Sequence, residues 1–132
     1  MALRRFYDWQ GDPDDLAGFL NPRNWPGRYW AVHDERGALV GFFQFERDGG
    51  TIEVGLGLRP DLTGRGLGAA FVQAGLDFAR RHYAPERFTL RVATFNRRAI
   101  RAYERADFVS GRVFTQATNG GLYEFVEMSR PA

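Results

Sequence analysis

The sequence predicts an α+β fold in which a mixed, mostly antiparallel sheet is built around a central β-α-β unit. Three observations predict it. In the first half of the chain, three successive strand-like segments are joined by turn signals, which is the pattern of an antiparallel meander. A stretch with helical periodicity then lies between two strand-like segments, and two further segments around Asn119-Gly120 form a closing hairpin. At a length of 132 residues, we expect residues 1–132 to form a single domain.

The composition excludes several classes of protein. The chain has no cysteine, which excludes disulfides, thiolate metal sites and a cysteine nucleophile, and we expect no metal centre. The 18 basic residues are all arginine against 16 acidic residues, and a net charge of +2 is too small to favour a nucleic-acid partner. No apolar run has membrane-spanning length, so we expect a cytoplasmic protein without a membrane partner.

The first half of the chain is predicted to carry four strands and one short helix. Ala2 to Asp8 is expected to be an edge strand. Asp12 and Pro13 are typical of an N-cap and a first helical position, and Asn21-Pro22 ends that helix. Turn signals at 34–37 and 48–50 separate the strands that we expect at 28–32, 38–45 and 51–58.

The second half is predicted to hold the β-α-β unit and the hairpin. Apolar residues at helical spacing predict a helix from Leu67 to about His82, and a strand follows at 88–93. Since a helical crossover joins parallel strands, the strands at 51–58 and 88–93 should be parallel. Asn96 is a natural N-cap for the next helix, which carries Tyr103 on its apolar face. Strands at 108–114 and 122–128 are expected to close the sheet.

A glycine-rich loop joins the third of the meander strands to the long helix. Gly64, Gly66 and Gly68 follow Pro60, and they let a backbone lie close to a ligand at the positive end of the helix dipole. Such a loop can receive a phosphate or pyrophosphate, whereas the plainer interpretation is a structural glycine turn. A Walker loop is excluded because the chain has no lysine, and a dinucleotide loop belongs after the first strand of a parallel sheet.

Two motifs resemble those of the GNAT N-acetyltransferases. The first is Leu58-Arg59-Pro60 with Gly66-x-Gly68, which is similar to the family's acetyl-CoA loop, although Thr63 stands where the family usually has Arg or Gln. The second is Asn96, Ala99 and Tyr103, followed by Asp107-Phe108 in place of the usual Gly-Phe. The resemblance covers about residues 38–128 and implies a GNAT-like sheet with helices on both faces.

The resemblance implies acetyl-CoA as a cosubstrate that is bound without a metal. The positions that match the family's cofactor site are Leu58, Thr63, Gly64, Arg65, Gly66, Leu67, Gly68, Asn96 and Arg98. Asn96 would contact the arm of CoA, but helix capping explains this residue equally well. Arg98 is one of four arginines near the predicted phosphate end, where a guanidinium suits phosphate oxygens.

The resemblance also implies two catalytic residues for direct attack of an amine on the thioester. Tyr103 would donate a proton to the leaving thiolate, and its alternative is a core aromatic residue. Glu53 would serve as the base for the acceptor amine, and its alternative is a solvated glutamate, because a one-residue register change turns it away. A bulge near Val54 to Leu58, where Gly55 and Gly57 lie, would supply a backbone N–H to the acetyl carbonyl.

The sequence therefore predicts an enzyme, an acetyl-CoA-dependent acyltransferase that acetylates a primary amine in a ternary complex. The acceptor is a small molecule or a peptide amine of unknown identity, and a homodimer is an open alternative to a monomer. A rival hypothesis is a non-catalytic acyl-CoA-binding module that acts as a sensor or partner subunit. A dinucleotide-dependent oxidoreductase is a more distant alternative.

Overall fold

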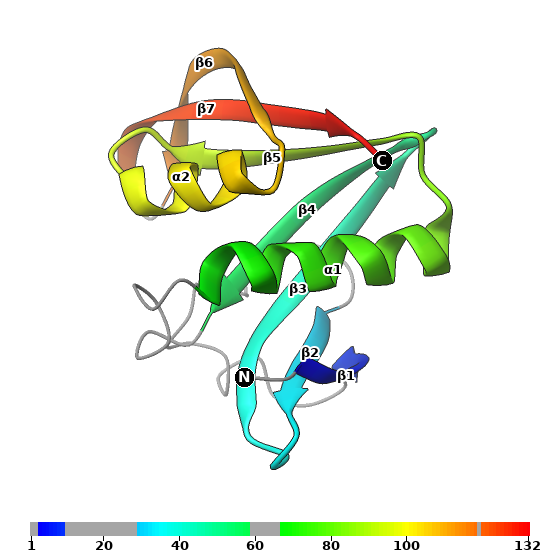
Figure 1. Cartoon of the computed structure of the whole chain (residues 1–132). Helices are drawn as coiled ribbons and strands as arrows, with labels where there is room; N and C mark the ends of the chain where they lie inside the picture. Colours follow the sequence, from blue (N-terminus) through cyan, green and yellow to red (C-terminus); the bar gives the residue numbers. More distant parts are fainter. Residues whose placement is uncertain (1–2, 10–28, 59–66, 119) are drawn as a thin grey trace.

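The computed structural model describes residues 3–9, 29–58, 67–118 and 120–132. These residues form one sheet of seven strands in the order β1-β2-β3-β4-β5-β7-β6, with two helices (Figure 1). The elements are β1 (Leu3–Trp9), β2 (Tyr29–Asp34), β3 (Leu39–Asp48), β4 (Thr51–Leu58), α1 (Leu67–Tyr83), β5 (Arg87–Ala93), α2 (Arg97–Arg105), β6 (Val109–Thr118) and β7 (Gly121–Pro131). β4 and β5 are parallel and the other neighbouring pairs are antiparallel, which confirms the predicted mixed sheet around a β-α-β unit.

The N-terminal strands form the predicted meander with β1 at one edge of the sheet. The turn between β2 and β3 is fixed by Asp34, whose Oδ1 accepts hydrogen bonds from the N–H groups of Arg36 at 2.9 Å and Ala38 at 3.0 Å. β3 and β4 then pair without interruption from Asp48 and Thr51 to Gly41 and Leu58, where β4 ends. The helix expected after Asp12 lies outside the described residues.

The long helix α1 covers the centre of the sheet with its apolar face. Its buried residues are Phe71, Val72, Gly75, Leu76 and Ala79. Gly75 lies so close to the ring of Phe43 on β3 that any side chain there would collide with it. The core beneath the helix comes from alternate residues of β4 and β5, among them Ile52, Val54, Phe88 and Leu90. None of the described helices is long and apolar enough to span a membrane.

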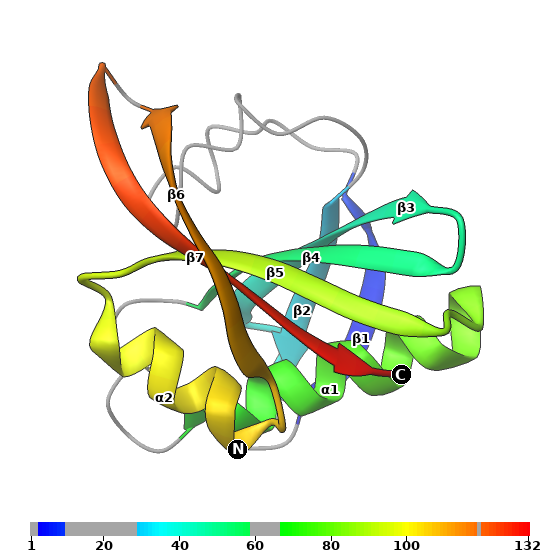
Figure 2. The same cartoon turned by 90° about the horizontal axis from the view of Figure 1, so that it is seen from above.

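Both described helices lie on the same side of the sheet, and α2 runs beside the first turns of α1 (Figure 2). The prediction of helices on both faces therefore remains a prediction, because the segment expected to hold the first helix is not among the described residues.

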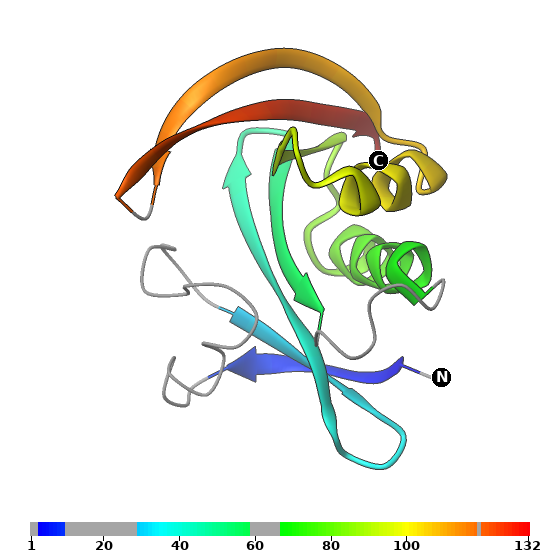
Figure 3. The same cartoon turned by 90° about the vertical axis from the view of Figure 1, so that its left-hand side faces the viewer.

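The closing hairpin is longer than the sequence predicted. β6 continues to Thr118 and β7 begins at Gly121. The two strands curve together as an arm at the end of the sheet (Figure 3). Phe108 precedes β6 rather than beginning it, and its side chain is buried in the core. Because β6 is the last strand in the sheet order, one of its edges has no neighbouring strand among the described residues.

Candidate functional site

The two parallel strands at the centre of the sheet separate early. They pair only at Thr51 with Arg87, Ile52 with Phe88 and Glu53 with Thr89. Beyond this point β4 continues to pair with β3, and β5 continues to pair with β7 (Figure 1). The rest of β4 and β5 therefore has no strand-to-strand hydrogen bonds across the divergence, and these backbone groups can bind another molecule.

The strands diverge toward the end of the sheet where α1 begins and α2 lies (Figure 1). Thr63, Gly64, Arg65 and Gly66 lie outside the described residues. The flanking predicted residues are described: Leu58 ends β4 and Leu67 begins α1, and both side chains pack against the core. The first turn of α1 has no acidic residue, so nothing in that turn opposes binding of an anion at its N-terminus.

Gly68 has a packing role that is separate from any ligand. A Cβ at this position would lie 3.3 Å from the Cβ of Ala102 on α2. The absence of a side chain thus lets the first turn of α1 approach α2 next to Tyr103. This contact brings Gly68 of the first motif next to the helix that carries the second motif.

Tyr103 is half-buried, and its ring contacts Phe108 edge to face at 6.3 Å between centroids. Burial raises the pKa of the Tyr103 hydroxyl to about 12, so the phenol keeps its proton at neutral pH. The hydroxyl makes no hydrogen bond to any described residue. This environment agrees both with a hydrogen-bond donor to a substrate and with a core aromatic residue.

The end of α2 explains the spacing of the second motif. The N–H of Phe108 donates to the Tyr103 carbonyl at 3.0 Å, and the N–H of Asp107 donates to the Glu104 carbonyl at 3.0 Å. These are the two hydrogen bonds of a Schellman motif, with Phe108 packing on Tyr103 as the accompanying apolar contact. The motif therefore caps the helix and orients the tyrosine at the same time.

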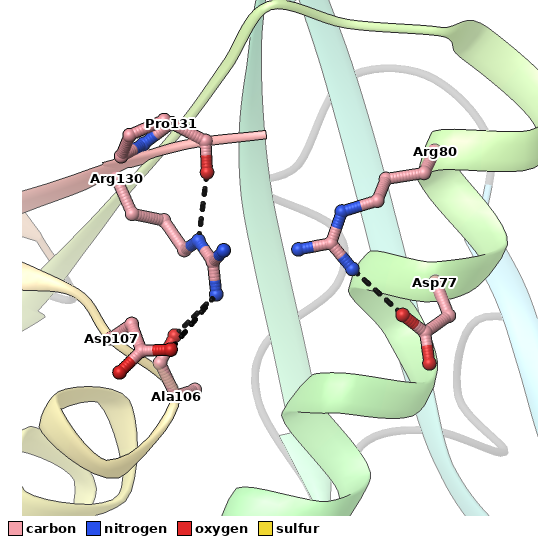
Figure 4. Close-up of polar contacts among 6 residues, drawn as sticks. All are labelled: Asp77, Arg80, Ala106, Asp107, Arg130 and Pro131. Atoms are coloured by element: carbon pink, nitrogen blue, oxygen red, sulfur yellow. Dashed lines mark hydrogen bonds and ion pairs between the residues drawn. The ribbon is translucent and has the colours of Figure 1, made fainter.

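Asp107 occupies the left-handed position of this cap, with φ of 69°. That conformation is the physical reason for glycine at this position in the family, and aspartate tolerates it better than most residues. Arg130 supports the turn: its Nη1 donates to the Ala106 carbonyl at 2.8 Å and lies 3.8 Å from Asp107 Oδ2 (Figure 4). The substitution at Asp107 is thus accommodated without loss of the turn.

Asn96 is the N-cap of α2, and its Oδ1 accepts a hydrogen bond from the Ala99 N–H at 3.3 Å. The prediction that Asn96 caps the helix is therefore confirmed, while its contact with CoA stays a prediction. Arg98 is exposed at the first turn of α2 and makes no ion pair with the described part of the chain. Its guanidinium is available to a phosphate group.

Glu53 lies at the last parallel pair, where the strands begin to diverge. Its neighbours Ile52 and Val54 are buried beneath α1, so alternation directs Glu53 to the opposite face of the sheet. Its Oε1 accepts a hydrogen bond from Arg91 Nη2 at 2.9 Å. Glu53 is therefore an ion-paired residue rather than an isolated solvated one.

The prediction of a bulge in β4 is wrong for the pairing of this strand with β3. Residues 51–58 pair with β3 in an unbroken register, including Gly55 with Gln44 and Gly57 with Phe42. The irregularity lies instead on the other edge of β4, where the ladder with β5 stops. A backbone donor for the acetyl carbonyl is therefore expected from this free edge.

Sequence reasoning missed Arg91, Gln116 and Arg130. Alternation along β5 could have placed Arg91 on the same face as Thr89, but its contact with Glu53 depends on the register between two strands far apart in the sequence. Arg130 could have been suspected only once Asp107 was known to need support. Among the described residues, no cluster of three or more His, Asp or Glu side chains could hold a metal ion.

Comparison with known proteins gives three findings. The model of the acetyltransferase (GNAT) family matches residues 2–108. Mycothiol acetyltransferases of Clavibacter sepedonicus and Clavibacter michiganensis subsp. michiganensis are 37% identical over 110 residues and 36% identical over 108 residues. Each alignment covers 81% of this chain but 34% of the relative, so the chain spans about a third of the length of these curated relatives.

The third finding concerns the fold. The structure of a spermidine N-acetyltransferase from Vibrio cholerae in complex with CoA and spermine superposes with a TM-score of 0.70 at 21% identity. The match covers 79% of this chain and 64% of that chain. The architecture described above is therefore shared with a solved acetyltransferase.

Proposed function

Because the chain belongs to the GNAT acetyltransferase family, we propose that it transfers an acetyl group from acetyl-CoA directly to a primary amine in a ternary complex. The observation that carries the proposal is the early divergence of β4 and β5 beside the first turn of α1. The free strand edges offer N–H and C=O groups to the amide-containing arm of CoA. A solved structure of the same fold holds CoA and spermine, which supports this class of ligands.

The cosubstrate is proposed to bind along the divergence with its phosphates at α1. Thr63, Gly64, Arg65 and Gly66 would surround the pyrophosphate together with the N–H groups of Leu67 and Gly68. Leu58 would contribute backbone groups at the end of β4. Asn96 would face the arm of CoA and Arg98 would bind a phosphate oxygen. No metal is required for any of these contacts.

The acetyl transfer itself is proposed to involve Glu53 and Tyr103. An alkylamine with a pKa near 10 is about one part in a thousand neutral at pH 7, so Glu53, or a water molecule bound to it, would accept a proton from the acceptor. The amine then attacks the thioester carbon and the C–S bond breaks. The high pKa of Tyr103 makes complete proton transfer to the thiolate strongly uphill. Tyr103 would therefore stabilise the thiolate chiefly as a hydrogen-bond donor.

The acceptor is proposed to be a small-molecule or peptide amine. A relative of this chain is named for mycothiol and a structural neighbour for spermidine, which are different molecules, and neither name transfers to this protein by similarity alone. A cytoplasmic location and a homodimer remain predictions. A non-catalytic acyl-CoA-binding module is the outcome that the test below would reveal if transfer fails.

The test begins with thermal unfolding in the presence of saturating acetyl-CoA, CoA or NADH. A ligand that binds only the native state at 100 times its Kd stabilises it by about 2.7 kcal/mol, so the two CoA species should raise the Tm and NADH should not. A screen for released thiol with spermidine, an amino acid, an aminoglycoside and a lysine-containing peptide then reports transfer. No Tm shift with acetyl-CoA would overturn the proposal.

A further inference from the structure

Three side chains form a hydrogen-bonded chain across the face of the sheet opposite the helices. Arg91 of β5 donates from Nη2 to Glu53 of β4 at 2.9 Å and from Nη1 to Gln116 of β6 at 3.1 Å. Because β7 lies between β5 and β6, the arginine reaches over one strand to its second acceptor. Two acceptors on separate strands fix the plane of the guanidinium, which a single acceptor would not do.

The hydrogen-bonded side chains of Glu53, Arg91 and Gln116 lie where β4 and β5 separate. Glu53 pairs with Thr89, and Arg91 is two residues further along β5 on the same face, just beyond the last parallel pair. The ion pair therefore spans the first step of the divergence. Both side chains are only partly exposed, at 33% for Glu53 and 41% for Arg91.

The contact uses one oxygen of the carboxylate. Arg91 binds Oε1, and no described residue donates a hydrogen bond to Oε2 of Glu53. The neighbouring charges explain why a cation is needed at this position. Glu46 of β3 is directly opposite Glu53 in the antiparallel ladder, and like charges in such a pair repel each other.

Other carboxylates do not compete strongly for Arg91. Its direct partner across the ladder with β7 is Glu127, and Glu127 has its own cation in Arg112 at 4.0 Å. The Arg91 guanidinium is therefore hydrogen-bonded to Glu53 and Gln116, whereas Glu127 is paired with Arg112. Without Arg91, Glu53 would face Glu46 with no described cation in hydrogen-bond contact.

The geometry points to Arg91 as a positioning residue for acetyl transfer. It holds Glu53 by Oε1 at the divergence, keeps this carboxylate from rotating away from Glu46, and leaves Oε2 free to accept a proton from the acceptor amine or its bound water. This role rests on the proposed function of Glu53. Gln116 acts in turn on Arg91 by fixing the second half of its guanidinium.

The test compares Arg91→Met with a matched control, Arg87→Met. Arg87 lies on the same strand and face, and its Nη2 donates to Ser129 Oγ at 2.9 Å rather than to Glu53. A general base contributes about 10² to 10⁴ in rate, so Arg91→Met should lower kcat at least about tenfold and Arg91→Lys less. The KM of Arg91→Met for acetyl-CoA should stay within about twofold of the wild-type value. Both kcat and KM of the control Arg87→Met should stay within about twofold of the wild-type values. The acceptor is the amine that gives the fastest thiol release in the screen above, starting with spermidine.

A double-mutant cycle separates positioning from a structural role. In a Glu53→Gln background, adding Arg91→Met should change kcat by less than about twofold, because the residue that it positions is already lost. Equal losses in both backgrounds, or equal kcat values for Arg91→Met and Arg87→Met, would overturn the role of Arg91 while the wild type remains active. A wild type that binds acetyl-CoA but acetylates no amine would overturn the proposed function, and the role of Arg91 with it.

Discussion

Replacement of Asp107 by glycine and by alanine tests the cap that orients Tyr103. Asp107 has φ of 69°, and its N–H donates to Glu104 at 3.0 Å in a bond that both variants keep. Both variants also lose the same ion pair with Arg130, which is worth at most about 0.5 kcal/mol because Asp107 is 80% exposed. The two variants therefore differ only in the Cβ at a left-handed position.

The expected difference follows from that Cβ. A left-handed conformation costs an L residue about 1–2 kcal/mol, and the greater backbone freedom of glycine in the unfolded state offsets about 0.5–1 kcal/mol of this. The glycine variant should therefore be more stable than the alanine variant by about 1 kcal/mol. For a domain of this size the difference corresponds to roughly 4 °C in Tm.

The assay is urea unfolding of both variants alongside Asp107→Asn, which removes the charge but retains a residue that tolerates this conformation. Equal stability of the glycine and alanine variants would refute the argument, because it would mean that the left-handed turn at the end of α2 is not strained. The same series reports on Tyr103, since a weakened cap should lower acetyl transfer more than acetyl-CoA binding.

Four further predictions concern the site and the core. Tyr103→Phe should leave acetyl-CoA affinity unchanged and lower kcat by about 10², because the developing thiolate loses a hydrogen-bond donor, as steady-state kinetics and titration calorimetry can measure. Because burial raises the pKa of Tyr103 to about 12, the wild type should lose roughly 2 kcal/mol of stability as pH rises from about 10 to 12, and the phenylalanine variant should not, which chemical unfolding at each pH would show. Gly75→Ala should destabilise the fold by about 1–3 kcal/mol in urea, since its methyl group would collide with Phe43. Gly66→Val should weaken acetyl-CoA binding without unfolding the chain, and an unchanged Kd would contradict the assignment of the loop.

The fold was largely predictable because local signals agreed with the final topology. The turns at Asp34 and Asp48 and the N-cap at Asn96 are determined by residues close in sequence, and the structure has them where they were expected. The parallel orientation of β4 and β5 followed from the intervening helix. The length of the closing hairpin was underestimated, because Thr115 to Thr118 continue a strand that only pairing with β7 defines.

The site was predictable in its motifs but less so in its contacts. Tyr103 and Asn96 could be located because their spacing is local. The partner of Glu53 could not, because it depends on how many residues β4 and β5 pair before they separate. The bulge in β4 was predicted from Gly55 and Gly57, whereas the strand keeps its register with β3 and loses its other neighbour instead. Only the tertiary register distinguishes these two kinds of irregularity.

The role of Asp107 could not be read from the sequence either. Asp107 departs from the usual glycine, yet the structure shows the Schellman hydrogen bonds intact with Arg130 beside the turn. Since Arg130 is more than 20 residues away in the chain, its contribution is visible only in three dimensions.

The most direct test of acetyl transfer by this chain is mass spectrometry of the amine panel after incubation with acetyl-CoA, together with the amount of thiol released. We predict that one amine gains an acetyl group for each CoA released, and that no comparable release occurs without an amine. Acetyl-CoA binding with no amine-dependent release and no acetylated product would contradict the account and leave the chain as an acyl-CoA-binding module.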